Sequence, residues 1–113
     1  MPRSSLYPEQ ILRRRVISWS LTLGVNPSDV LIKPMVDRWG SCAPDGTITL
    51  AADLARLDTS AQDYVIVHEL LHLRHPGHGR VFKALLALHV PEWAEIDELL
   101  STESPSRPME LHA

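Results

Sequence analysis

The feature that most constrains this chain is an apolar stretch, Tyr64 to Leu73, that carries the motif H-E-x-x-H. Apolar side chains occur on nearly all sides of this stretch when it is drawn as a helix. It is therefore predicted to be a helix covered by a sheet on one side and by another helix on the other. His68 and His72, at positions i and i+4, share one face, so both imidazoles can bind one metal ion. Glu69 lies beside the first histidine and can take a proton from a metal-bound water.

A third ligand is predicted from the residues that follow. His75 falls on the same helical face, but seven residues of helical rise place it about 10 Å along the axis from His68, too far to share one ion. Pro76 disfavours a helical conformation at His75 and ends the helix there, and the turn after it lets the chain reverse. The reversal brings His78 back, so His68, His72 and His78 are the predicted ligands, with water in the open fourth position. His75 is predicted to lie behind the ligands or at the surface.

Other ligand sets remain open. His75 itself or a carboxylate from a downstream helix is an alternative third ligand, the latter as in zinc sites of two histidines and one glutamate. Zinc is the expected metal, although imidazole also suits copper, nickel, cobalt and iron. Candidate partners for the substrate, or for negative charge that develops during a reaction, are Tyr64, Arg38 and Arg80.

Length and composition place the motif in a small protein. The 113 residues predict one domain, 1–100, followed by a polar, proline-containing tail, 101–113, that is expected to be disordered. The net charge of -3 indicates no obligatory nucleic-acid or acidic-membrane partner. No apolar run approaches the roughly 20 residues that span a bilayer. A single cysteine excludes an internal disulfide, so a cytoplasmic location is expected.

The remaining elements follow from periodicity and turn residues. A buried stripe at helical spacing predicts a helix from Pro8 to Gly24. A β-branched run, Val30 to Met35, predicts a short strand, and Pro34 confines it to a sheet edge or places the proline at the strand's end. The Pro-Asp-Gly turn within Ala43–Gly46 predicts a β-hairpin between two extended runs. Two further helices are expected, the last of them from Pro91 to Leu100.

Two segments resemble a known family. Arg38–Cys42 (RWGSC) and Asp63–His78, which holds the H-E-x-x-H motif, are similar to the YgjP-like metallopeptidases, relatives of the SprT-like zinc peptidases. The resemblance implies an α+β, minimal zincin-like domain. Such a domain has an N-terminal helix, a small three-stranded, mostly antiparallel sheet, the H-E-x-x-H helix and one or two C-terminal helices. It also implies that His68, His72 and His78 bind one zinc ion and that Glu69 is the catalytic base.

The resulting hypothesis is a zinc-dependent metallopeptidase that hydrolyses a peptide or protein substrate with a metal-bound water and Glu69 as general base. One alternative is a non-catalytic, zinc-stabilised binding or accessory module. Another is a nucleic-acid-associated protease, suggested by the run Arg13–Arg15 and by the SprT-like kinship. The run is interpreted first as a solvated helix flank.

Overall fold

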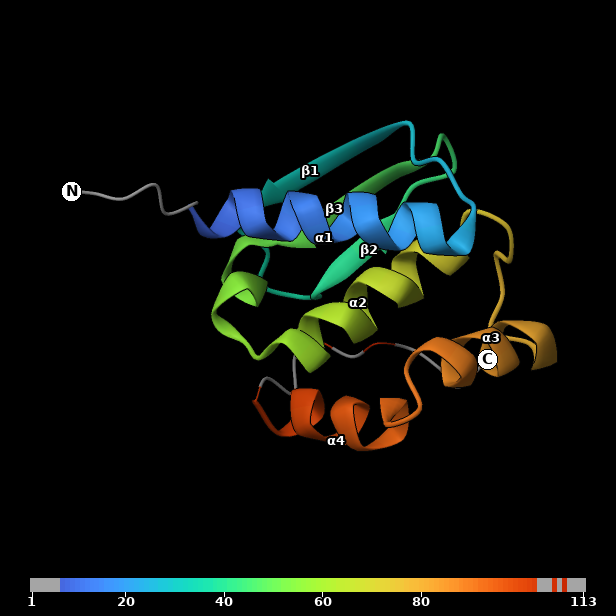
Figure 1. Ribbon diagram of the computed structural model, residues 1–113. Helices are drawn as coiled ribbons and strands as arrows, with labels where there is room; N and C mark the ends of the chain where they lie inside the picture. The colour runs from blue at the N-terminus through green and yellow to red at the C-terminus, as the bar shows by residue number, and fades with distance from the viewer. Residues whose placement is uncertain (1–6, 104–106, 108, 110–113) are drawn as a thin grey trace.

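Helix α2 (Thr59–Leu71), which holds most of the motif, lies at the centre of the fold (Figure 1). The structure, a computed structural model, describes residues 7–103, 107 and 109. Helix α2 packs against helices on two sides and against strands of the sheet. Its side chains from Tyr64 to Leu71 are all buried. The predicted helix, apolar on nearly all sides and covered on both, is confirmed.

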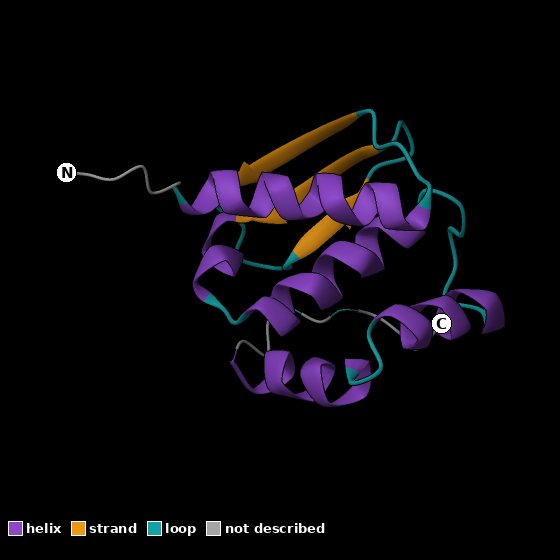
Figure 2. Cartoon of the chain, viewed as in Figure 1, coloured by secondary structure: helices purple, strands orange, loops and turns teal. Residues whose placement is uncertain are grey.

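The other elements surround α2 in a mixed α+β arrangement (Figure 2). In chain order they are α1 (Pro8–Leu23), β1 (Asp29–Lys33), β2 (Gly40–Cys42), β3 (Thr47–Ala51), the 3-10 helix η1 (Ala52–Arg56), then after α2, α3 (Arg80–His89) and α4 (Trp93–Glu103). The predicted N-terminal helix is confirmed, and it ends at Gly24, whose φ of 68° is a left-handed conformation that favours glycine. The fold class is α+β, as expected.

The three-stranded sheet is mixed, with the order β1-β3-β2. Strands β2 and β3 form the predicted antiparallel hairpin, with Ser41 opposite Thr49. Strand β1 pairs with β3 in parallel, with Leu31 opposite Thr49, where a mostly antiparallel sheet was expected. The parallel pair arises because the chain reverses twice between β1 and β3, once after Pro34 and once in the hairpin. Strand β1 lies at an edge of the sheet and ends directly before Pro34, which agrees with the prediction from this proline.

The C-terminal end of α2 differs from the expected continuous helix to His75. The regular helix stops at Leu71, and His72 follows in a right-handed helical conformation as its cap. Tight backbone turns then carry the chain to His75, whose amide donates to the carbonyl of Leu71 at 2.9 Å. The motif's second histidine therefore lies where the helix gives way to the loop that leads to His78.

The segment expected as a disordered tail begins as helix. Helix α4 continues to Glu103, and the hydroxyls of Ser101 and Thr102 donate to backbone carbonyls four residues earlier. Arg107 and Met109 are buried, because Arg107 donates to the carboxylate of Asp53 and to two backbone carbonyls. The remaining residues of 104–113 lie outside the described part of the chain. Within the described part, no helix is long and apolar enough to span a membrane.

Candidate metal centre

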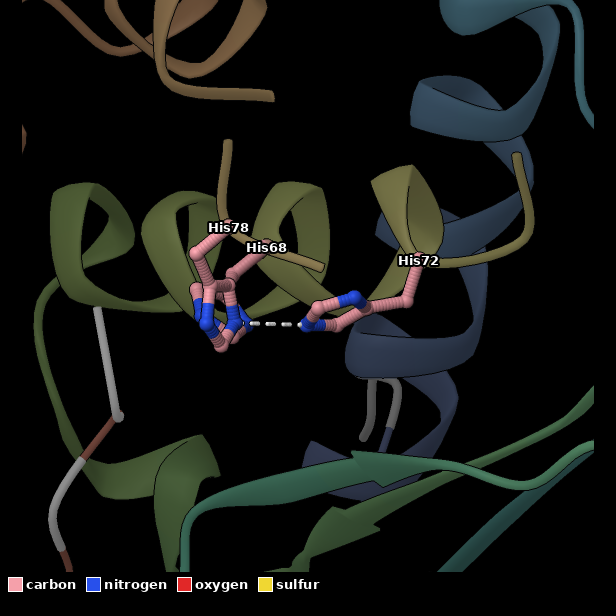
Figure 3. A group of neighbouring side chains, drawn as sticks. All are labelled: His68, His72 and His78. Carbon is pink, nitrogen blue, oxygen red and sulfur yellow. Dashed lines mark hydrogen bonds between the residues drawn. The ribbon is translucent and has the colours of Figure 1, made fainter. Parts of the chain in front are cut away.

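Three histidines converge at the end of α2. One ring nitrogen from each of His68, His72 and His78 lies within 4.8 Å of the others. Figure 3 shows the imidazoles of His68 and His78 side by side and facing that of His72. The Nε2 atoms of His72 and His78 are 3.0 Å apart. This arrangement offers three imidazole nitrogens to a single ion.

The hydrogen bond behind His72 selects the tautomer that a metal requires. Its Nδ1 lies 3.0 Å from the backbone carbonyl of His75, which can only accept. Nδ1 therefore carries the proton, and Nε2 keeps a lone pair that faces the other two histidines. Burial, the largest cause, lowers the pKa of His72, which favours the neutral ring that binds metal. His75 thus supports the site through its main chain.

The imidazole of His68 is also held by a hydrogen bond at its Nδ1 atom, here with a neighbouring side chain. The side chain is buried, and its Nδ1 is 3.2 Å from Oε2 of Glu69. Its Nε2 is buried without a hydrogen-bond partner among the described residues. A buried polar atom without a partner carries a cost of about 1–3 kcal/mol, and coordination to a metal would remove it. The donor set therefore fits a metal ion such as zinc.

Phe82 of α3 forms an apolar wall behind the three imidazoles. Its ring centroid lies 5.2 Å from that of His68, 4.8 Å from that of His72 and 5.0 Å from that of His78. The side chain is 1% exposed. Periodicity predicts Phe82 only as a core residue of α3, because a helical pattern does not say which imidazoles lie opposite. In the structure it limits the rotation of all three rings.

Glu69 lies at the floor of a cleft of about 750 Å³ next to the histidines. The residue is buried, with 4% of its surface exposed. The cleft is lined by residues of β2, the hairpin turn, α2 and the α2–α3 loop, and by Met109: Asp37, Arg38, Gly40, Ser41, Cys42, Ala43, Pro44, Asp45, Gly46, His68, Glu69, His72, Leu73, Pro76, His78 and Met109. Three histidines and one carboxylate thus meet at an opening large enough for a short peptide segment.

Of the other candidate residues, Arg38 lines the cleft, whereas Tyr64 and Arg80 do not. Arg38 lines the cleft and lies 3.7 Å from Asp37, with about half of its side chain exposed. Tyr64 is fully buried, and its hydroxyl donates to Asp97 of α4 at 2.9 Å, so it is oriented towards α4. Burial and the neighbouring Asp97 raise the pKa of Tyr64 above its usual range. Arg80 is exposed at the start of α3 and does not line the cleft.

The arginine run on α1 is partly used in packing. Arg13 donates to the carbonyl of Val30 at 2.7 Å, and Arg15 forms an ion pair with Asp63 of α2. Trp19 donates to the same carboxylate at 2.8 Å. These contacts join α1 to the sheet and to α2. They engage two of the three guanidinium groups, those of Arg13 and Arg15, in interactions within the protein.

Sequence motifs do not predict that Gly40 and Met109 line the cleft. Gly40 belongs to the RWGSC segment. This motif marks β2 as a candidate functional segment, but it does not indicate that β2 contacts α2. Met109 is 68 positions downstream of Ser41 in the chain yet lines the same cleft. Arg107, two positions before Met109, is also buried, with its guanidinium carbon 4.2 Å from the centre of the Trp39 ring. No local pattern in the tail indicates these contacts.

Comparison with known proteins agrees with this geometry. The family described as "YgjP-like, metallopeptidase domain" matches residues 7–103. No curated protein sequence matches the chain. Among solved structures, the metallopeptidase zymogen jannalysin of Methanocaldococcus jannaschii is 25% identical, with a TM-score of 0.73 over 81% of this chain and 95% of that chain. The metallopeptidase zymogen abylysin of Pyrococcus abyssi is 23% identical, with a TM-score of 0.75 over 86% and 98%.

Proposed function

The chain belongs to the YgjP-like metallopeptidase family, and from this membership we propose that it is a zinc-dependent peptidase that hydrolyses peptide bonds in a protein or peptide substrate. The convergence of His68, His72 and His78 beside a buried glutamate at an open cleft is the observation that carries the proposal. Three protein ligands and an accessible cleft are typical of a catalytic zinc site, whereas a structural site is closed by a fourth protein ligand.

His68, His72 and His78 would hold the ion, each through the ring nitrogen that faces the other two. When bound, zinc supplies Lewis acidity, which lowers the pKa of water and polarises a carbonyl. The chain's own residues do the rest. The His75 carbonyl fixes the His72 tautomer, and Phe82 keeps bulk water from the back of the site.

Glu69 is the proposed general base. Its carboxylate lines the cleft next to His68, so it can take a proton from the attacking water and deliver it to the departing amine. Hydrolysis of an amide requires the transfer of one proton from the attacking water oxygen to the leaving nitrogen. A carboxylate in this position can carry that proton. Arg38, at the rim of the cleft, is the remaining candidate for a contact with substrate.

The edge of β2 is the proposed site for the substrate backbone. The sheet order ends with β2, so among the described strands its outer edge has no neighbour. Gly40, Ser41 and Cys42 of this strand line the cleft with Glu69. An extended peptide that paired with this edge would gain main-chain hydrogen bonds and lie across the site.

A residue near the C-terminal end of the described chain, Met109, also lines the cleft. Arg107 donates hydrogen bonds to Asp53 and to the carbonyls of Met35 and Val36. Both solved neighbours are described as zymogens. We further propose that this chain is latent until Met109 leaves the cleft. The variant Arg107→Ala should raise peptidase activity over the wild type, and unchanged activity would contradict latency.

A fluorescence-quenched peptide library tests the function directly. The zinc-loaded chain and its Arg107→Ala variant should cleave members of the library, and chelation of the metal should abolish cleavage. Glu69→Gln in either background is the matched control, because it keeps size and shape while removing the base. Zinc bound at one equivalent without any cleavage, and with identical behaviour of Glu69→Gln, would instead support the non-catalytic zinc-stabilised module.

A further inference from the structure

The RWGSC segment contains a glycine, Gly40, whose backbone lies against the side chain of the proposed base, Glu69. Gly40 is the first residue of β2 and lies opposite Leu50 of β3 in the register of the sheet. A Cβ atom placed on Gly40 would lie 3.0 Å from Cγ of Glu69, 3.1 Å from Cγ1 of Val65 and 3.3 Å from the carbonyl oxygen of Thr49. Ordinary carbon contacts are about 3.5–4.0 Å, so no other residue fits here without displacement of a neighbour.

The glycine is required by contact and not by backbone conformation. Positive φ angles among the described glycines occur at Gly24 and Gly46, and Gly40 is not one of them. An alanine could therefore adopt the backbone of residue 40, but its methyl group would meet the Glu69 side chain. The space that Gly40 leaves free is the space in which Glu69 lies.

Of the three groups that an added methyl would meet, the side chain of Glu69 is the one that can move, because it lines the cleft. Its residue is 4% exposed, and Oε2 is 3.2 Å from Nδ1 of His68. Val65, one helical turn before it, is fully buried, and Thr49 contributes backbone that is part of the sheet. A methyl group at position 40 would thus be relieved most readily by rotation of Glu69 away from β2.

From this geometry we propose that Gly40 is a positioning residue for the reaction: the absence of a side chain at this point of β2 sets the orientation of the Glu69 carboxylate. The inference rests on the proposed function, and it assigns a role to the RWGSC segment that metal binding leaves unexplained. The three histidines project from α2 and the following loop, and none of them supplies any of the three atoms nearest to the added Cβ.

Kinetics of Gly40→Ala test the proposal. With zinc content equal to that of the wild type, kcat should fall by about 10- to 100-fold, since a misplacement of about 1 Å has effects of this size. KM should stay within about twofold, because alanine keeps the backbone groups of β2 that are proposed to pair with the substrate. Gly79→Ala is the matched control: it adds the same methyl group near the site, but its Cβ would meet nothing within 4 Å. Equal kcat values for the two variants would overturn the proposal.

A second arm needs no activity and separates this inference from the proposed function. Glu69→Ala removes the Cγ atom that the new methyl would meet. The drop in Tm caused by Gly40→Ala should therefore be smaller in the Glu69→Ala background, by about 4 °C or more, which corresponds to about 1 kcal/mol in a domain of this size. Equal drops in the two backgrounds, or failure to fold in both, would assign Gly40 to packing against Val65 and overturn the proposal. Absence of turnover in both the wild type and Arg107→Ala would contradict the proposed function alone.

Discussion

The Nε2 atoms of His72 and His78 lie 3.0 Å apart, although six positions separate the residues in the chain and only the first is at the end of α2. The two nitrogens are close enough to form a hydrogen bond with each other, and the same closeness allows both to face one cation. His68 completes the set from one helical turn before His72. The predictions below follow from this arrangement and from its supports.

Removal of single histidines should separate ligands from their supports. His68→Ala and His78→Ala should each lose most of the bound zinc, because two remaining imidazoles bind far less tightly than three. His75→Ala should keep it, because residue 75 supports His72 through its backbone carbonyl, which alanine also has. Elemental analysis of the three variants after identical purification checks this. Zinc retained in His78→Ala but lost in His75→Ala would move the third ligand to His75.

Substitution of Glu69, the proposed base, should strongly lower turnover without loss of the metal. Glu69→Gln should lower kcat by about 10²- to 10⁴-fold, the usual contribution of a positioned general base. Its zinc content and Tm should remain close to those of the wild type, since the amide keeps the volume of the side chain. Steady-state kinetics with one cleaved peptide, measured beside metal content, provides the test. A Glu69→Gln protein with undiminished kcat would exclude this residue as the base.

Acid should release the metal and weaken the metal-free fold. Imidazole binds metal only when neutral, so zinc should be lost as the pH falls below about 6. The pKa of His72 is lowered from its usual 6.5 by burial, so the unfolded chain binds its proton at a higher pH than the folded one. The stability of metal-free protein is therefore fully present above pH 6.5 and declines as the pH falls below it. Dialysis at pH 7, 6 and 5 followed by elemental analysis measures the first effect, and full zinc retention at pH 5 would contradict three-imidazole ligation.

Tyr64 should matter for stability more than for chemistry. Its buried hydroxyl donates to Asp97 and joins α2 to α4, so Tyr64→Phe should lower the free energy of unfolding by about 1–2 kcal/mol. Zinc content and KM should be unchanged, because the hydroxyl is engaged by α4. Chemical denaturation of the variant and of Asp97→Asn checks the coupling. A large loss of kcat in Tyr64→Phe with normal stability would instead return the hydroxyl to the active site.

Much of the fold is encoded in short-range patterns. The helical stripe before Gly24, the Pro-Asp-Gly hairpin and the apolar helix around His68 were predictable because each depends on residues a few positions apart. The convergence of His78 with the other two histidines was also predictable, since a proline turn controls it. Local patterns do not encode strand partners, so the parallel pairing of β1 with β3 was not foreseen.

The parts of the site that escaped prediction are long-range contacts. Phe82 reads as an ordinary core residue until α3 is placed opposite the imidazoles. Gly40 reads as a turn or strand residue until β2 is placed against Glu69. Arg107 and Met109 lie in a polar segment whose composition predicts disorder, and the ion pair with Asp53 that orders Arg107 spans 54 positions. Each depends on tertiary packing that a single sequence does not display.

The three histidines and the glutamate occupy one continuous stretch of eleven residues, His68 to His78. Closing so short a loop costs little chain entropy, so the reactive groups can assemble as soon as α2 and its following turn form. The sheet contributes chiefly the surface against which this stretch packs. At Gly40 this surface has no side chain, which leaves room for Glu69. Sequence change in α1, β1 or α4, none of which lines the cleft, is therefore free to alter stability while the proposed ligands and base stay within a single segment of the chain.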